Sequence, residues 1–327
     1  MAGITRVAVV RSGLGESVHE VDVAVVDAEG SVVVSSGDPG TVAYARSCMK
    51  PVQAAVSMAL AGLDYSDREA AVMCASHNAE PVHLEAVRAV LARGGVEEAA
   101  LRCPAMLPGD QESAMAAPRK LAINSDCSGK HAGMLAALRA RGWPLETYRD
   151  PDHPLQQRVL AGALVATGLP DVRVGVDGCG VPVHGFALAR MARVYATLAV
   201  PERFGDDLAA WAERAVGAMR AEPYLVAGRN RLDTAVIRRT EGAVIVKAGA
   251  EGMMCASALG RRLGIALKVR DGSRRATSPA MVAVLRHLEL LSDEDVEELR
   301  PFAHPHVLGG GEPVGELQTH VELAAAD

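Results

Sequence analysis

The chain has 327 residues, 49% of them hydrophobic, which suffices for a large buried core in one compact domain or in two closely joined lobes. The chain has 34 lysines and arginines and 40 aspartates and glutamates, which gives a formal net charge of −6. Only 3% of its residues are aromatic. No basic patch is interleaved with aromatic residues, so nucleic acid and anionic membranes are excluded as expected partners.

The N-terminal segment Met1–Arg11 is apolar for only a few residues at a time, which is typical of a first strand rather than of a signal peptide. No apolar run reaches the length of a membrane span. The six cysteines include no CxxC pair, and in a chain without a leader such cysteines are better explained as free thiols or metal ligands than as disulfides. We therefore expect a cytoplasmic protein.

The first predicted elements are strands. Val7–Arg11 and Val21–Val26 are rich in β-branched residues. The turn Asp27–Gly30 leads into a further short run, Ser31–Ser35, and this order indicates a hairpin.

A long, mostly helical region follows, from Ser47 to about Arg220. Its predicted helices are Ser47–Ala61, Pro81–Arg93, Lys130–Arg141, Pro154–Thr167 and Phe204–Ala221. Strand patterns return at Ala243–Lys247 and Gly264–Val269, and a last helix is predicted near Pro279–Leu291.

Strands at both ends thus bracket a helical middle, which indicates an α+β or layered α/β fold. We expect a single domain, 1–327. Its sheet lobe would come from about 1–45 and 240–327, and its helical lobe from about 46–239, with a cleft between the lobes.

The first candidate for chemistry is the pair Ser47 and Lys50. Pro51 is tolerated only in the first turn of a helix, so Ser47 is placed at the helix start with Lys50 three residues on. A neighbouring lysine amine can activate a serine hydroxyl as a nucleophile. The alternative is that Ser47 is an ordinary N-cap.

Two glycine-rich cysteine loops form the second candidate. Asp126–Gly133 gathers a thiol, a hydroxyl, an amine and an imidazole at a predicted helix start, and Asp177–Pro182 is a similar loop. If Cys127, Lys130 and Cys179 come together, they could hold Zn²⁺ with a fourth position open. The alternative is two tight turns whose cysteines merely pack.

Lys247 is the third candidate, because it ends a predicted strand and a glycine-rich turn follows it. Its ammonium could reach inward towards a substrate that lies along the strand edge. The alternative is an exposed lysine at a strand end. Asp233 is either an N-cap or a substrate contact.

Five motifs combine in one order along the chain: ARSCMKP, ASHN, CSGKHAGM, DGCGVP and VKAGAEG. This combination resembles the rhizobial-type L-asparaginases, from about Val21 to Gly272. That family is unlike the bacterial asparaginases with a threonine nucleophile, and it is similar in fold to serine β-lactamases and glutaminases.

The resemblance implies two Ser–Lys pairs, Ser47 with Lys50 and Ser76 with Lys247, with Lys268 as the less favoured second lysine. It implies a zinc site of Cys127, Lys130 and Cys179. The residues expected to bind substrate are Arg46, His77, Asn78, Asn124, Asp126, His131, Asp177 and Gly178, of which His131 and Asp177 would also lie beside the metal. Where the family carries His-Asn-Asn, this chain has Asn124-Ser125-Asp126, which puts substrate preference in question.

The predicted activity is hydrolysis of L-asparagine to L-aspartate and ammonia, with L-asparagine as the small-molecule partner and a homodimer as the expected assembly. One rival is a β-lactamase or glutaminase-like hydrolase of another amide. The other is a non-catalytic protein that binds an amino acid or senses zinc. Ammonia release from asparagine would separate these alternatives.

Overall fold

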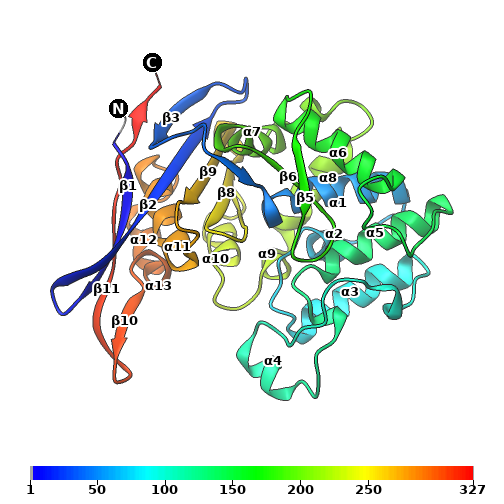
Figure 1. Ribbon diagram of the computed structural model, residues 1–327, viewed down its shortest axis with the longest axis horizontal. Helices are drawn as coiled ribbons and strands as arrows, with labels where there is room; N and C mark the ends of the chain where they lie inside the picture. The colour runs from blue at the N-terminus through cyan, green and yellow to red at the C-terminus, as the bar shows by residue number, and fades with distance from the viewer. Residues whose placement is uncertain (1–2, 327) are drawn as a thin grey trace. The chain divides into compact units, whose positions relative to one another are not determined.

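The computed structural model describes residues 3–326 (Figure 1). The chain divides into two compact units. Unit 1 comprises Met1–Cys48, Phe186–Val200 and Arg239–Asp327, and unit 2 comprises Met49–Gly185 and Pro201–Arg238. Unit 1 takes in Phe186–Val200, which the predicted lobes assigned to the helical part. Among residues 3–326, none of the helices combines the length and the apolar character that crossing a membrane requires.

Unit 1 is built on a curled antiparallel sheet with the order β10-β11-β1-β2-β9-β8-β7, and β3 and β12 extend it beside β2. Its strands are β1 Thr5–Arg11, β2 Leu14–Val26, β3 Val32–Ser36, β7 Val244–Ala248, β8 Met253–Ala258, β9 Leu263–Val269, β10 His306–Gly309, β11 Glu312–His320 and β12 Ala324–Ala325. The short strand β4, Val42–Tyr44, precedes the Ser47 segment. N-terminal and C-terminal strands therefore pair in one sheet, as predicted.

The centre of this sheet is buried on both sides. The first five residues of β2, Leu14–Val18, are exposed or half-buried, but its last six residues, Val21–Val26, are all buried. Helix α7, Leu188–Leu198, packs on β9 and β2, and helix α11, Thr277–His287, packs on β11, β9 and β1. Two short helices, α12 (Asp293–Glu298) and α13 (Arg300–Ala303), follow α11 and lie against it.

Gly264 of β9 allows α7 to approach the sheet closely. A Cβ at this position would lie 1.9 Å from the carbonyl oxygen of Ala192 and 2.3 Å from the amide nitrogen of Ala196. We expect Gly264→Ala to lower the free energy of unfolding by about 3 kcal/mol, because the helix backbone must move away. Gly260→Ala is the matched control, because its Cβ would meet nothing within 4 Å.

Urea denaturation of both variants checks this prediction. The control is expected to unfold at the wild-type midpoint. A Gly264→Ala protein with wild-type stability would contradict the close packing of α7 on β9.

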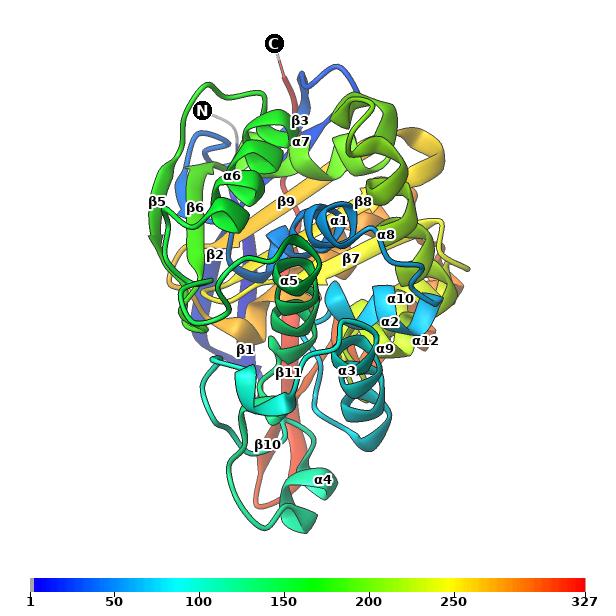
Figure 2. The same ribbon diagram turned by 90° about the vertical axis from the view of Figure 1, so that its right-hand side faces the viewer.

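Unit 2 is mainly helical. Its helices are α1 Lys50–Ala61, α2 Asp67–Met73, α3 Pro81–Arg93, α4 Gln111–Ala116, α5 Ser128–Arg141, α6 Pro154–Thr167, α8 Ala209–Ala221, α9 Pro223–Val226 and α10 Leu232–Arg239. Helix α5 is central, since it packs on α1, α3 and α2 and all its residues from Ser128 to Leu138 are buried (Figure 2). A Cβ at Gly129 would lie 2.0 Å from the carbonyl oxygen of Val72, so this glycine is needed where α5 crosses α2.

The predicted fold class, α/β with terminal strands around a helical middle, is confirmed. Helices α3 and α6 have the predicted bounds. The predicted helix at 47–61 begins with a 3₁₀ turn, Arg46–Met49, before α1. The mostly helical middle also holds a hairpin that the pattern did not predict, formed by β5 Arg173–Val176 and β6 Pro182–Ala187.

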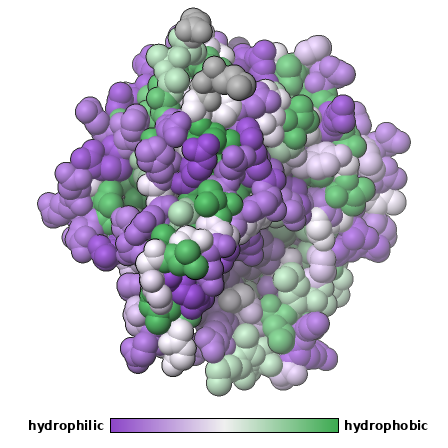
Figure 3. Space-filling model, turned by 60° about the vertical axis from the view of Figure 1, so that its left-hand side comes forward, coloured by the Kyte–Doolittle hydropathy of each residue, from purple (hydrophilic) through white to green (hydrophobic). Residues whose placement is uncertain are grey.

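The face that Figure 3 shows is largely hydrophilic, and its hydrophobic side chains are scattered among polar ones. Exposed hydrophobic residues of unit 1 include Leu14 and Val18 of β2 and Leu308 of β10. Single exposed hydrophobic residues are normal on a protein surface.

Candidate functional site

Lys50 is the first residue of α1, and its side chain is fully buried in unit 2. Its Nζ donates to the carbonyl oxygen of Ala75 at 2.7 Å, to Ser76 Oγ at 2.9 Å and to the carbonyl oxygen of Asp126 at 3.1 Å. These three oxygens match the three hydrogen-bonding positions of a lysine Nζ. A fully buried lysine amine therefore lies directly beside a serine hydroxyl.

The segment that carries Ser76 is held on its backbone. The amide of Ser76 donates to the carbonyl oxygen of Val226 at 3.0 Å, and the amide of Asn78 donates to that of Ala227 at 2.9 Å. Arg231 adds a clamp, because its Nη1 donates to the Ser76 carbonyl oxygen at 3.2 Å and to Asn78 Oδ1 at 2.9 Å. The backbone that carries the Ser76 hydroxyl is thus held in place on both sides.

His77 packs behind Ser76 as a neutral imidazole. Its Nδ1 accepts from the amide of Ala79 at 3.1 Å, so the proton lies on Nε2, which faces Ser128 Oγ at 3.0 Å. Burial, and then the nearby His83 and Lys50, hold the pKa of His77 well below its usual value. His77 is therefore a hydrogen-bonding and packing residue here, stacked on His83 at 5.2 Å between ring centroids.

The predicted substrate residues Asn124 and Asp126 have different surroundings. Asn124 is buried and its Nδ2 donates to the carbonyl oxygen of Met106 at 3.2 Å, which holds the loop together. The Asp126 carboxylate is 47% exposed and lies 3.8 Å from Lys50 Nζ. Asp126 is therefore the one of the two that can reach a ligand beside Lys50.

The three predicted zinc ligands lie together in unit 2. Cys127 precedes α5, Lys130 lies in its first turn, and Cys179 lies in the loop between β5 and β6. Lys130 Nζ donates to Cys179 Sγ at 3.1 Å, and the Cys127 thiol is hydrogen-bonded to Cys179. All three side chains are buried.

The charges of this cluster follow from its contacts. The hydrogen bond from Cys127 and the nearby Lys130 ammonium outweigh burial and lower the pKa of Cys179 to about 6. The same hydrogen bond, together with burial, raises the pKa of Cys127. Burial alone would lower the pKa of Lys130, but the neighbouring Cys179 and Cys127 raise it. The cluster is thus a thiolate held between a thiol and an ammonium.

This donor set fits zinc in its chemistry. Two sulfurs and an amine converge, and thiolate sulfur is a preferred zinc ligand. Residues 3–326 contain no group of three or more His, Cys, Asp or Glu side chains placed to hold a metal ion. The third ligand from the cluster would therefore have to be Lys130, after it has lost its proton.

Asp177 and His131, the two residues expected beside the metal, have different contacts. Asp177 Oδ2 lies 3.6 Å from Cys179 Sγ, and its Oδ1 accepts from the amide of Gly178 at 2.8 Å. His131 is turned to Tyr148, with its Nδ1 2.6 Å from the phenol oxygen. Asp177 therefore contacts a predicted ligand, whereas the His131 imidazole pairs with a tyrosine that no motif indicated.

In unit 1, the Ser47 segment lies against β7. Cys48 Sγ donates to the carbonyl oxygen of Lys247 at 3.4 Å, and Lys247 is fully buried with its Nζ 2.8 Å from the carbonyl oxygen of Ala248. Ser47 itself is half-buried in the 3₁₀ turn. The structure thus brings the Ser47 segment to Lys247, which is buried rather than exposed at a strand end.

Two further predicted residues lie in unit 1. Lys268 of β9 is only half-buried, and burial lowers its pKa. Arg46 has a left-handed backbone with φ of 50°, and its Nη1 lies 4.0 Å from Glu251 Oε1. A non-glycine residue in this conformation directly before Ser47 marks a constrained backbone at that position.

The described contacts place Lys50 beside Ser76, and the Cys48 thiol next to Ser47 beside the backbone of Lys247. The pairing of Ser47 with Lys50 and of Ser76 with Lys247 stays a prediction. The long Lys50 side chain reaches the Ala75–Ser76 backbone of a neighbouring segment, which no local spacing could reveal.

Other residues around the site were not predicted. Arg231 clamps the Ser76 segment, Ser128 faces His77, and Tyr148 contacts His131. Asp233 lies inside the first turn of α10 and is buried, so it is not an N-cap. The only signal for Arg231 was its place in a run rich in arginine and asparagine near Asp233.

The hairpin that presents Cys179 carries a buried histidine, His184, on β6. Burial lowers the pKa of His184 to about 4. In the unfolded chain the group titrates near pH 6.5, so below that pH the unfolded state binds a proton that the folded state excludes. Stability is therefore lost as the pH falls from about 6.5 towards 4, by about 2 kcal/mol between pH 7 and pH 5.

Urea denaturation at pH 7 and at pH 5 measures this loss. The His184→Leu variant has no titrating group there and is expected to lose about 2 kcal/mol less between the two pH values than the wild type. Equal losses in both proteins would contradict a buried neutral His184.

Comparison with known proteins identifies the family to which the chain belongs. The family model described as L-asparaginase II matches residues 7–319, and a search of curated proteins found no match. A β-lactamase from Mycobacterium bovis is 16% identical, with a TM-score of 0.43 over 83% of this chain and 95% of that chain. A protein from Bacteroides dorei, provisionally described as a β-lactamase, is 14% identical, with a TM-score of 0.39 over 87% of this chain and 94% of that chain. By the match over nearly its whole length, the chain belongs to the L-asparaginase II family of amide-hydrolysing enzymes.

Proposed function

We propose that the chain is an L-asparaginase that hydrolyses the side-chain amide of L-asparagine with a serine nucleophile and lysine proton carriers. The family supports hydrolysis of an amide. The observation that carries the Ser–Lys chemistry is the contact between the buried Lys50 amine and the Ser76 hydroxyl at 2.9 Å. Lysine is rarely fully buried, so a fully buried lysine amine beside a serine hydroxyl is a candidate for a functional group.

In the proposed reaction, Ser47 Oγ attacks the amide carbon of the substrate. The proton of the Ser47 hydroxyl passes to Lys50. The C–N bond breaks as the nitrogen takes a proton and leaves as ammonia. Water then attacks the seryl ester, which releases L-aspartate and restores the serine. To accept the Ser47 proton, Lys50 must be in its neutral amine form when Ser47 attacks, and Ser76 Oγ, 2.9 Å from Nζ, is the hydroxyl that hydrogen-bonds to it.

Ser47 is proposed as the nucleophile because it lies at the entry to a helix. The 3₁₀ turn Arg46–Met49 runs directly into α1, whose N-terminal amides carry partial positive charge. These amides would stabilise the oxyanion that forms on the substrate. Lys247, buried on β7 behind the Ser47 segment, is proposed as the second lysine.

The cysteine cluster is proposed to hold Zn²⁺ through Cys127, Cys179 and Lys130. When bound, the ion would supply positive charge that orients and polarises a substrate group. Asp177, in contact with Cys179, would orient that ligand. The serine attack does not depend on the ion.

Cys179→Ser is therefore expected to raise KM more than it lowers kcat, because binding rather than chemistry is lost. Steady-state kinetics with L-asparagine checks this split, and elemental analysis of protein purified without chelator checks for zinc. Cys103→Ser is a matched control, because Cys103 is also a buried free cysteine but its thiol donates to the carbonyl oxygen of Ala122. A fall in kcat at unchanged KM in Cys179→Ser would contradict the binding role.

The proposed activity is tested by ammonia release from L-asparagine and, separately, from L-glutamine. We expect turnover of asparagine. Tight binding of asparagine without ammonia would favour the non-catalytic alternative, and faster release from glutamine would change the substrate. Release of ammonia from neither amide would contradict the proposal.

A further inference from the structure

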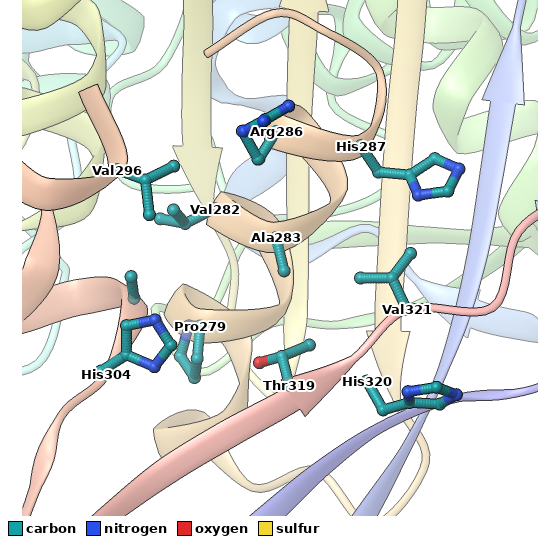
Figure 4. Close-up of a pocket in the computed structure, with 11 residues that line it drawn as sticks. Pro279, Val282, Ala283, Arg286, His287, Val296, His304, Thr319, His320 and Val321 are labelled. Carbon is teal, nitrogen blue, oxygen red and sulfur yellow. The ribbon is translucent and has the colours of Figure 1, made fainter. Parts of the chain in front are cut away.

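One cavity of unit 1 contains none of the Ser–Lys or cysteine residues. It has a volume of about 400 Å³ and lies between α11, the short helices α12 and α13, and the end of β11 (Figure 4). Its lining residues come from four segments of the chain that are all in unit 1. A ligand bound there would be a second ligand, separate from the substrate at the serine site.

One part of the cavity wall is apolar. Val282 and Ala283 come from α11, Val296 from α12 and Val321 from the chain just after β11. Figure 4 shows these side chains around the same space. Such a wall favours the hydrocarbon part of a ligand, through burial of apolar surface.

Two polar atoms in the cavity wall have unmet hydrogen-bonding capacity. Thr319 Oγ1 and His304 Nδ1 are both shielded from solvent, and neither has a hydrogen-bond partner in the described chain. Both residues line the cavity, where Figure 4 shows the Thr319 hydroxyl turned to the side of His304. A buried polar atom without a partner is costly, so a bound group that pairs with both atoms gains free energy.

At the rim of the cavity, the Arg286 guanidinium has N–H groups that can donate to a bound anion. Arg286 Nε donates to Asp293 Oδ1 at 2.7 Å, which uses one of the five N–H donors of the guanidinium. His320 Nε2 lies 3.3 Å from Glu322 Oε1, and His287 is a third imidazole beside His304 and His320. These imidazoles do not form a metal site, since no group of His, Cys, Asp or Glu in residues 3–326 is placed to hold an ion.

We propose that this cavity binds a small monocarboxylic acid with an apolar body. After a small rotation of both side chains towards the cavity, the carboxylate would accept hydrogen bonds from the Thr319 hydroxyl and from His304 Nδ1–H, with Arg286 at the rim attracting the negative charge. The apolar body would lie on Val282 and Val296. Asparagine and aspartate fit poorly, because their ammonium group and second polar end would meet this apolar wall.

The test uses benzoate and hexanoate as probes, with benzamide and hexanamide as uncharged controls of similar shape. Calorimetric titration of the whole chain at fixed pH is expected to show saturable binding of both acids and weaker binding of both amides. Thr319→Val is expected to weaken benzoate binding by about tenfold or more, because a hydrogen bond to a charged group is lost. It should not lower the melting temperature, because the lost hydroxyl had no partner.

Thr5→Val is the matched control in the same sheet. The Thr5 hydroxyl accepts from Ser36 Oγ at 3.0 Å and from the Glu322 amide at 3.2 Å, so this change should lower the melting temperature and leave benzoate affinity unchanged. Ala283→Leu, which fills the cavity, should abolish binding of both acids.

Three results would overturn the site. They are the absence of saturable binding of either acid at about 10 mM probe, equal affinity for acid and amide, and wild-type benzoate affinity in both Thr319→Val and Ala283→Leu. Because binding is measured without asparagine, none of these outcomes depends on the proposed hydrolysis.

Discussion

Lys50→Met is expected to lower kcat for asparagine about 1,000-fold, the range lost when a positioned proton carrier is removed. Methionine keeps most of the side-chain length but has no proton to give or take. Because the lysine is fully buried, bulk water cannot replace it at the Ser76 hydroxyl. The measurement is ammonia release under saturating substrate.

The control for this variant must separate chemistry from folding. Removing the amine leaves the carbonyl oxygens of Ala75 and Asp126 without their donor, so stability will also fall. Lys120→Met is the matched control, because it makes the same change at an exposed lysine and is expected to keep full activity. A folded Lys50→Met protein with more than about a tenth of wild-type kcat would contradict the role of Lys50.

Ser47→Ala is expected to abolish turnover, with a loss of about 1,000-fold or more, because no other hydroxyl takes its place as nucleophile. Ser47 lies in the 3₁₀ turn before α1 and is not its N-cap, which is Met49, so its loss should cost no more than the roughly 1 kcal/mol of a lost cap and the protein should stay folded. Ser76→Ala is expected to lower kcat less, by about 10-fold to 100-fold, since it removes the hydrogen-bond partner of Lys50 and not the attacking atom.

The two serine variants are measured side by side, with thermal unfolding to confirm folding. Ser57→Ala, on the buried side of α1, is the matched serine control, because its hydroxyl donates to the carbonyl oxygen of Gln53 within the same helix. It is expected to keep wild-type kcat. A larger loss in Ser76→Ala than in Ser47→Ala would exchange the roles proposed for the two serines.

Some elements could be predicted because local residues set their ends. Helices α3 and α6 each begin with a proline in the first turn, and α6 ends at Gly168 with a left-handed backbone. Prolines and glycines at these positions are local signals that do not depend on the rest of the fold.

Other elements had no such signal. Strand β8 is buried along its whole length, so its residues Met253–Ala258 show no alternation of polar and apolar side chains. Strand β11 is rich in charged and polar residues, and it was not predicted as a strand. Its place beside β1 comes from pairing across most of the chain length.

The grouping of the cysteine-loop residues could be predicted better than the individual contacts around Lys50. The motifs identified the residue types of the Ser–Lys and cysteine clusters, and Cys127, Lys130 and Cys179 do lie together. The contact of Lys50 with Ser76 depends on how the segment after α2 passes α1, and the Arg231 clamp depends on the chain before α10. Neither of these contacts could be predicted from the spacing of residues along the sequence.

The central claim, covalent catalysis by a serine next to lysine, is tested most directly by trapping the ester. The chain is mixed with L-asparagine, quenched in acid during turnover, digested and analysed by peptide mass spectrometry. The predicted result is an aspartyl ester on Ser47 that is absent from the Ser47→Ala protein. An ester on Ser76 would contradict the choice of nucleophile, and continued ammonia release with no ester on either serine would contradict the Ser–Lys mechanism itself.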